Sequence, residues 1–177
     1  MGDPKRQRRR YNRPSHPWRA ERIAEEKELL KKYGLKNKKE IWRARTLVGR
    51  FRQQARSLLA SSGETVEKDK KELLDKLNRL GILEGRSLDD VLALNVEHLL
   101  DRRLQTMVHK KGLVATLKQS RQFVVHGHVL VGDNAVSVPA YMVSRAEEDT
   151  IKVSDKIKVI KVGEGGDKAQ EAPKEAG

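Results

Sequence analysis

Two histidines on either side of a glycine, His126 and His128 around Gly127, are the first residues of this chain whose type and spacing suggest chemistry. They lie in the apolar stretch SRQFVVHGHVLVG. Such a pair can ligate a metal, move a proton or donate to a phosphate. A zinc site needs further His, Cys or carboxylate ligands, and the chain has 5 histidines and no cysteine. We therefore expect no metal and no cofactor.

Catalytic motifs are missing from the sequence. It contains no glycine-rich phosphate loop, no Gly-x-Ser-x-Gly elbow and no His-Glu-x-x-His pair, which are the patterns that place a nucleophile, a phosphate or a zinc ion. We therefore predict that the protein is not an enzyme and has no catalytic residues.

With a metal site and catalysis disfavoured, the remaining interpretation of the two histidines is that they contact phosphate, and their surroundings favour it. Residues 98–131 hold one acid, Asp101, and a basic group that consists of Arg102, Arg103, Lys110, Lys111, Lys118 and Arg121. A histidine at a turn can donate to a phosphate or a 2′-hydroxyl. We predict that these cations bind RNA together with Gln122, His126 and His128. For His126, capping of a helix end is an equally good interpretation.

The charge of the chain is distributed unevenly. The formal net charge is +13, and the whole excess falls on residues 1–60, whereas residues 61–177 are neutral. Such asymmetry indicates a polyanionic partner. Nucleic acid is favoured because neutralising phosphates releases counterions. A membrane is not, since no strongly apolar face accompanies the charge.

The segment KRQRRRYNRPSHPW near the N-terminus reads as a basic arm. It has too few aliphatic residues to fold alone, so it is either a solvated arm or a localisation patch, or it becomes ordered on RNA. We favour RNA because Tyr11 and Trp18, which can stack on bases, alternate with cations. The predicted RNA contacts of the arm are Arg8, Arg9, Arg10 and Arg13.

A helix from about Lys39 to Ala60 carries the second group of arginines. At 100° per residue its apolar face comprises Ile41, Ala44, Leu47, Val48, Phe51, Ala55, Leu58 and Leu59. The predicted RNA contacts on its two edges are Arg45, Arg52 and Arg56 on one and Arg43 and Arg50 on the other. None has an acidic partner at i±4 on this helix. A solvated helix surface is the alternative.

The remaining pattern predicts the elements that position these residues. Helices are expected over residues 18–33, over the leucine repeat that ends at Gly81, from an N-cap at Ser87, from Leu99 to Gly112, and from Thr116 to Gly127. Strands follow on both sides of the turn at Gly132, and again around Ser154. The fold class is therefore α+β: a mainly helical N-terminal part, then two helices packed on a short sheet, then a disordered tail. The expected domains are residues 1–97, 98–162 and 163–177.

Several short motifs carry a resemblance to a known family. The motifs are Arg103-Leu104-Gln105-Thr106, Lys110 to Gly112, Arg121-Gln122, His128 to Val131 and Pro139-Ala140-Tyr141. This region resembles the small RNA-binding domain named after ribosomal small-subunit protein four. The stretches EIWRARTLVGRFRQQARSLL and LLDKLNRLGILEGRSLDDVLALNVEHLLDRRLQT extend the resemblance to the archaeal and eukaryotic type of that family, over about Pro4 to Val162.

The resemblance implies a structural component of the small ribosomal subunit, in the cytoplasm, that binds ribosomal RNA and nucleates assembly of its five-prime region. It also implies neighbouring small-subunit proteins as partners, notably ribosomal protein five, and a place near the side where messenger RNA enters. Two alternatives stay open: an accessory domain of an RNA-modifying enzyme, and a free-standing RNA-binding regulator or chaperone.

Overall fold

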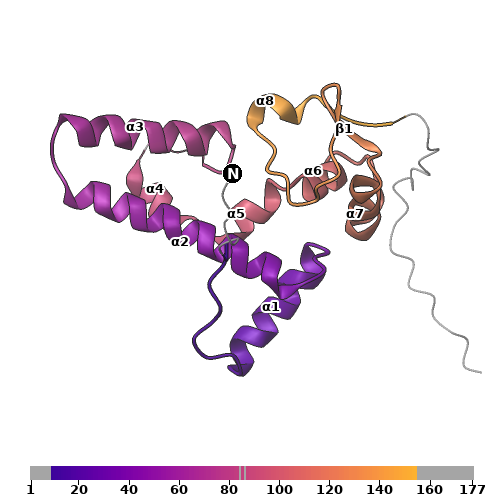
Figure 1. The fold of residues 1–177 in the computed structure, drawn as a ribbon, viewed down its shortest axis with the longest axis horizontal. Helices are drawn as coiled ribbons and strands as arrows, with labels where there is room; N and C mark the ends of the chain where they lie inside the picture. Colours follow the sequence, from indigo (N-terminus) through magenta and orange to yellow (C-terminus); the bar gives the residue numbers. More distant parts are fainter. Residues whose placement is uncertain (1–8, 84, 86, 155–177) are drawn as a thin grey trace, which may run out of the picture.

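The computed structural model describes residues 9–83, 85 and 87–154, and it is mainly helical with one small sheet (Figure 1). The elements in chain order are α1 (Ala20–Lys32), α2 (Lys38–Ala60), α3 (Glu64–Arg79), α4 (Leu88–Ala93), α5 (Val96–Asp101), α6 (Leu104–Lys110), α7 (Leu117–Val125), β1 (Val129–Val131), β2 (Asn134–Ala135), α8 (Arg145–Glu148) and β3 (Ile151–Val153). The predicted α+β class is confirmed. The predicted tail and the predicted strand residues after Ser154 lie outside the described residues.

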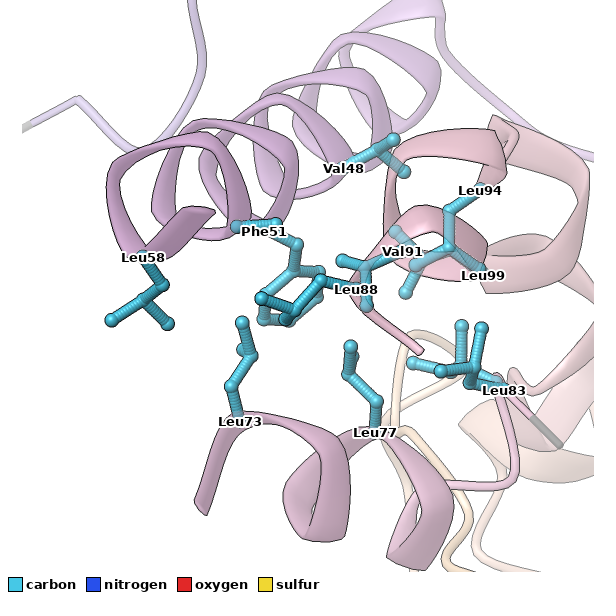
Figure 2. Close-up of a cluster of buried hydrophobic side chains, with 12 residues drawn as sticks. Val48, Phe51, Leu58, Leu73, Leu77, Leu83, Leu88, Val91, Leu94 and Leu99 are labelled. Carbon is cyan, nitrogen blue, oxygen red and sulfur yellow. The ribbon is translucent and has the colours of Figure 1, made fainter. Parts of the chain in front are cut away.

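Helix α2 is the axis of the N-terminal part, because one of its faces is continuously apolar. Its buried residues are Ile41, Val48, Phe51, Ala55 and Leu58. Figure 2 shows Phe51 and Leu58 directed toward Leu73 and Leu77 of α3, with Val91 of α4 closing the cluster. The predicted face is thus confirmed for these positions. It is wrong for Leu59, which lies near the end of α2 and is exposed.

The predicted continuous helix from Leu99 to Gly112 is wrong, because the chain breaks at Arg102 and Arg103 into α5 and α6. Arg103 is extended and forms an antiparallel bridge with Met142. The backbone N–H of Leu104 donates to the Tyr141 carbonyl at 2.8 Å. A contact with residues far along the chain therefore replaces the helical backbone hydrogen bonds at this point. The periodicity of the sequence does not indicate such a contact.

The part of the chain from α6 to β3, which we call the C-terminal module, has its own core beneath a three-stranded antiparallel sheet of order β2-β1-β3. Helices α6 and α7 pack on each other, and buried residues such as Val108, Val124 and Val129 fill the space against the sheet. Thr116, near which the helix was predicted to start, caps α7 by accepting from the N–H of Gln119. Gly132 alone has a positive φ in the two-residue turn between β1 and β2, which is the pattern of a type II′ hairpin.

Two polar side chains join the N-terminal part to the module. The amide Nε2 of Gln105, a buried residue of α6, donates to the carbonyls of Tyr33 at 3.3 Å, Gly34 at 3.1 Å and Leu117 at 3.0 Å. Glu40 of α2 accepts from Arg103 at 2.6 Å and from Arg121 at 3.1 Å. We call this contact the seam. It fixes the position of α1 and α2 relative to α6 and α7.

Candidate nucleic-acid interface

The arm is held against α2 by specific contacts. The ring of Tyr11 lies 6.0 Å from the ring of Trp42, and the guanidinium of Arg9 lies 5.8 Å from the Tyr11 ring. The backbone N–H of Asn12 donates to Oγ1 of Thr46 at 3.0 Å. The described part of the arm therefore follows α2 instead of leaving the protein surface, and its arginines are brought beside those of the helix.

An open hollow of about 410 Å³ lies between the arm and α2, and we call it the arm pocket. Its lining consists of Asn12, Arg13, Pro14, Trp42, Arg45, Thr46, Gly49, Arg50 and Gln53. The lining contains three arginines and no carboxylate. A guanidinium presents paired N–H donors that match phosphate oxygens, so this hollow suits the phosphate backbone of a nucleic acid. Gly49 faces the open space of this hollow, because a Cβ there would meet nothing within 4 Å.

The five predicted arginines of α2 fall into different environments. Arg45 and Arg50 line the arm pocket, and Arg43 and Arg56 are also exposed. Arg52 is different: its Nη2 donates to the carbonyl of Leu94 and, at 3.5 Å, to Oδ1 of Asn95. Its guanidinium thus connects α2 to the junction of α4 and α5. The structure therefore does not bring Arg52 together with Arg45, although the sequence places them on one edge.

A second basic depression lies along the seam, between the end of α1 and the start of α7, and we call it the seam groove. Its volume is about 760 Å³. The residues that line it are Leu30, Lys31, Gly34, Leu35, Lys36, His109, Ala115, Thr116, Leu117, Lys118 and Arg121. Two segments far apart in sequence contribute its cations, and again no carboxylate is in the lining. Sequence reasoning missed Lys31, Lys36 and His109, because only the packing of α1 on the module brings them beside Lys118.

The predicted module cations are largely engaged within the protein. Arg102 donates to Glu148 at 2.8 Å and to the carbonyl of Val143 at 3.1 Å. Arg103 is buried on Glu40. Lys110 pairs with Asp101 at 3.1 Å, and Lys111 donates to the carbonyl of Glu148. The structure therefore does not gather these residues on one open face. Lys118 and Gln122 are exposed, and their predicted RNA contacts stay predictions, as do those of the others.

Glu40 is the carboxylate that holds two of these arginines. Burial by itself would raise the pKa of Glu40, but the hydrogen bonds and charges of Arg121 and Arg103 outweigh it and keep that pKa below its ordinary value. The ionised carboxylate is thus the form that the seam requires. Arg121 remains one-quarter exposed and also lines the seam groove.

The two histidines lie where α7 turns into β1. His126 is the C-cap residue of α7 and is exposed, and Gly127 takes a φ of 73° that reverses the chain. The imidazole of His128 is half-buried, stacks on that of His126 at 6.0 Å and meets the ring of Phe123 edge-on at 6.2 Å. In the described ranges, no three His or carboxylate residues are grouped as a metal would need.

The predicted arm contacts are exposed where the structure describes them. Arg9, Arg10 and Arg13 all lie at the surface, whereas Arg8 lies outside the described residues. No helix in the part of the chain that the structure describes is long and apolar enough to span a bilayer.

Comparison with known proteins gives matches along almost the whole chain. Residues 2–101 match the family described as ribosomal protein S4/S9 N-terminal domain, and residues 102–151 match the S4 domain. Proteins called small ribosomal subunit protein uS4 are similar. That of Methanothermobacter thermautotrophicus is 53% identical over 85% of this chain and 89% of its own. That of Methanococcus aeolicus is 52% identical over 85% and 86%, and that of Hyperthermus butylicus 50% over 85% and 86%.

Proposed function

The chain belongs to the ribosomal protein S4 family, and from this premise we propose that it is a structural, non-enzymatic component of the small ribosomal subunit that binds small-subunit ribosomal RNA directly. The observation that carries the proposal is the arm pocket, where three arginines from two segments meet without a carboxylate. RNA phosphates release counterions when arginines neutralise them, so such a pocket favours an RNA backbone.

The RNA follows a path over both basic depressions. The arm pocket lies along residues 42–53 of α2, and the seam groove lies at the end of α1; both are open and lined by cations. We infer that one RNA segment contacts the arm and α2 while another contacts the seam groove through Lys31, Lys36 and Lys118. Both expected domains, residues 1–97 and 98–162, therefore contribute residues to the site, and the seam fixes their relative position.

The finer partners rest on family membership and on charge. We propose that the protein acts early, on the five-prime region of the RNA, and that it lies beside ribosomal protein five and near the side where messenger RNA enters. An accessory domain of a modifying enzyme and a free-standing regulator are not favoured, because the similar proteins are components of the small subunit by name.

The proposal is tested by filter binding. We expect the protein to bind a transcript of Methanothermobacter small-subunit ribosomal RNA at least tenfold more tightly than large-subunit RNA of equal length, at the same salt concentration. Sedimentation of extract supplies a second test: the protein should move with small subunits. Equal affinity for both RNAs, with the protein remaining at the top of the gradient, would contradict the proposal and favour the regulator.

A further inference from the structure

The two aromatic residues of the arm have different surroundings. Tyr11 is engaged by Trp42 and Arg9, whereas the side chain of Trp18 is exposed, with a relative exposure of 89%. The other tryptophan, Trp42, also has a partner for its ring nitrogen, since Nε1 donates to Glu26 at 2.9 Å. Unlike Tyr11 and Trp42, Trp18 is therefore available to stack on a ligand.

The backbone on both sides of Trp18 is fixed, although its ring is free. Nη2 of Arg22 donates to the carbonyl of Pro17 at 2.8 Å, and the N–H of Ile23 donates to the carbonyl of Arg19 at 3.2 Å. Arg22 is itself held by the buried carboxylate of Glu26 at 3.4 Å. Stacking of a ligand on Trp18 thus costs little conformational entropy of the backbone, because that backbone is already ordered.

The hollow beside Trp18 is lined both by apolar residues, such as Pro17, Ile23 and Trp42, and by cations. Trp18 forms part of the wall of a hollow of about 490 Å³ that also contains Arg13, Lys38 and Lys39. Lys38 pairs with the buried Glu26 at 3.3 Å, which leaves Arg13 and Lys39 as the cations exposed to a ligand. Arg13 also lines the arm pocket, so a phosphate chain that enters this pocket passes beside Trp18.

These surroundings select the ligand. A protein partner would need an apolar patch with few charges at its centre. The other exposed large hydrophobics of the described chain, Leu59, Val125 and Val138, do not line the hollow beside Trp18. Cations lie among the apolar residues that do line it. One unoccupied ring beside arginine and lysine instead fits a nucleotide, whose base stacks while its phosphates meet the cations.

We propose that Trp18 is the stacking platform for one unpaired base of the bound RNA, with Arg13 and Lys39 on the flanking phosphates, while Tyr11 anchors the arm and contacts no base. The inference rests on the proposed function, because it identifies the base that accompanies the phosphates in the arm pocket. It assigns the two aromatics separate tasks that the sequence could not distinguish.

The test uses the full chain and the Methanothermobacter small-subunit transcript. We expect Trp18→Ala and Trp18→Leu to lower affinity about 5- to 150-fold, as loss of base stacking does, with the salt slope unchanged because no charge is removed. Trp18→Phe should keep affinity within about threefold, since phenylalanine also stacks on bases. Leu59→Ala, which removes another exposed apolar side chain, should bind like the wild type.

Fluorescence supplies the direct readout. In the wild type, RNA should quench the exposed tryptophan and protect it from acrylamide. Trp18→Phe should remove the contribution of Trp18 to that change and leave only that of Trp42. The proposal is overturned if Trp18→Ala binds as tightly as the wild type, or if Trp18 stays open to acrylamide in the RNA complex. It is also overturned if protection requires added ribosomal proteins. If the wild type shows no preference for small-subunit RNA, it is the proposed function that fails, whatever the variants of Trp18 do.

Discussion

Arg45 and Arg52 show how the surroundings of a residue change what its type predicts. Both lie on one edge of α2, but Arg45 lines the arm pocket and Arg52 donates to the carbonyl of Leu94. We therefore expect Arg45→Gln to weaken RNA binding and leave the unfolding free energy unchanged. Arg52→Gln should lower that free energy by about 1–3 kcal/mol, because a buried acceptor loses its donor. Urea unfolding and filter binding distinguish the two effects, and equal effects on binding would contradict the separation.

Glu40 gives a prediction for pH. Its pKa in the folded protein lies below the ordinary value of 4.5, so its ion pairs stabilise the fold above the unfolded pKa. That contribution is lost as pH falls through the folded pKa. Glu40→Gln should lower stability by about 1–3 kcal/mol at pH 7, since it leaves the buried Arg103 without a charged acceptor.

Urea unfolding at pH 7 and pH 4 measures this contribution. The difference between the wild type and Glu40→Gln should shrink at the lower pH. Glu67→Gln, at an exposed position of α3, serves as the control and should change stability little at either pH. A difference that is the same at both pH values would contradict the role given to the Glu40 carboxylate.

At the scale of elements, two glycines test the seam and α2. Gly34 has a φ of 57°, and a Cβ there would lie 2.9 Å from Cβ of Leu117. Gly34→Ala should therefore destabilise the protein by more than the roughly 1–2 kcal/mol that a left-handed residue costs. Gly49→Ala should stabilise α2 by about 0.5–1 kcal/mol, because its Cβ meets nothing. Thermal unfolding of both variants checks this. If both substitutions raise the melting temperature, or both lower it, the packing described here is contradicted.

Which elements could be predicted depended on how local their causes are. The bounds of α1 and α2, the N-cap of Ser87 and the start of α7 near Thr116 follow from periodicity and capping within a few residues. The break at Arg103 could not be predicted, because its cause is a bridge to Met142. The same holds for the seam groove, since no pattern in the sequence indicates that Lys31 meets Lys118.

At the scale of the whole molecule, we propose that the two parts form one RNA-binding surface because the seam holds them together. Charge reversal tests this best at Lys118, which is exposed in the seam groove. Arg121 is less suitable, because a glutamate there would face Glu40 and disturb the fold. We expect Lys118→Glu to weaken RNA binding more than Lys152→Glu, an exposed change on β3 outside the groove. Equal losses would indicate diffuse electrostatic attraction.

The most direct test of the account is the salt dependence of binding when the arm pocket loses its charge. Each phosphate contact contributes roughly 0.7–0.9 to the slope of log affinity against log salt concentration. Arg13, Arg45 and Arg50 replaced together by glutamine should lower the slope for small-subunit RNA by about two to three. The matched control replaces Lys68, Lys71 and Lys76, exposed lysines of α3, by glutamine. We predict that the control keeps the wild-type slope and affinity; equal slopes for both triple variants would contradict a specific RNA site in the arm pocket.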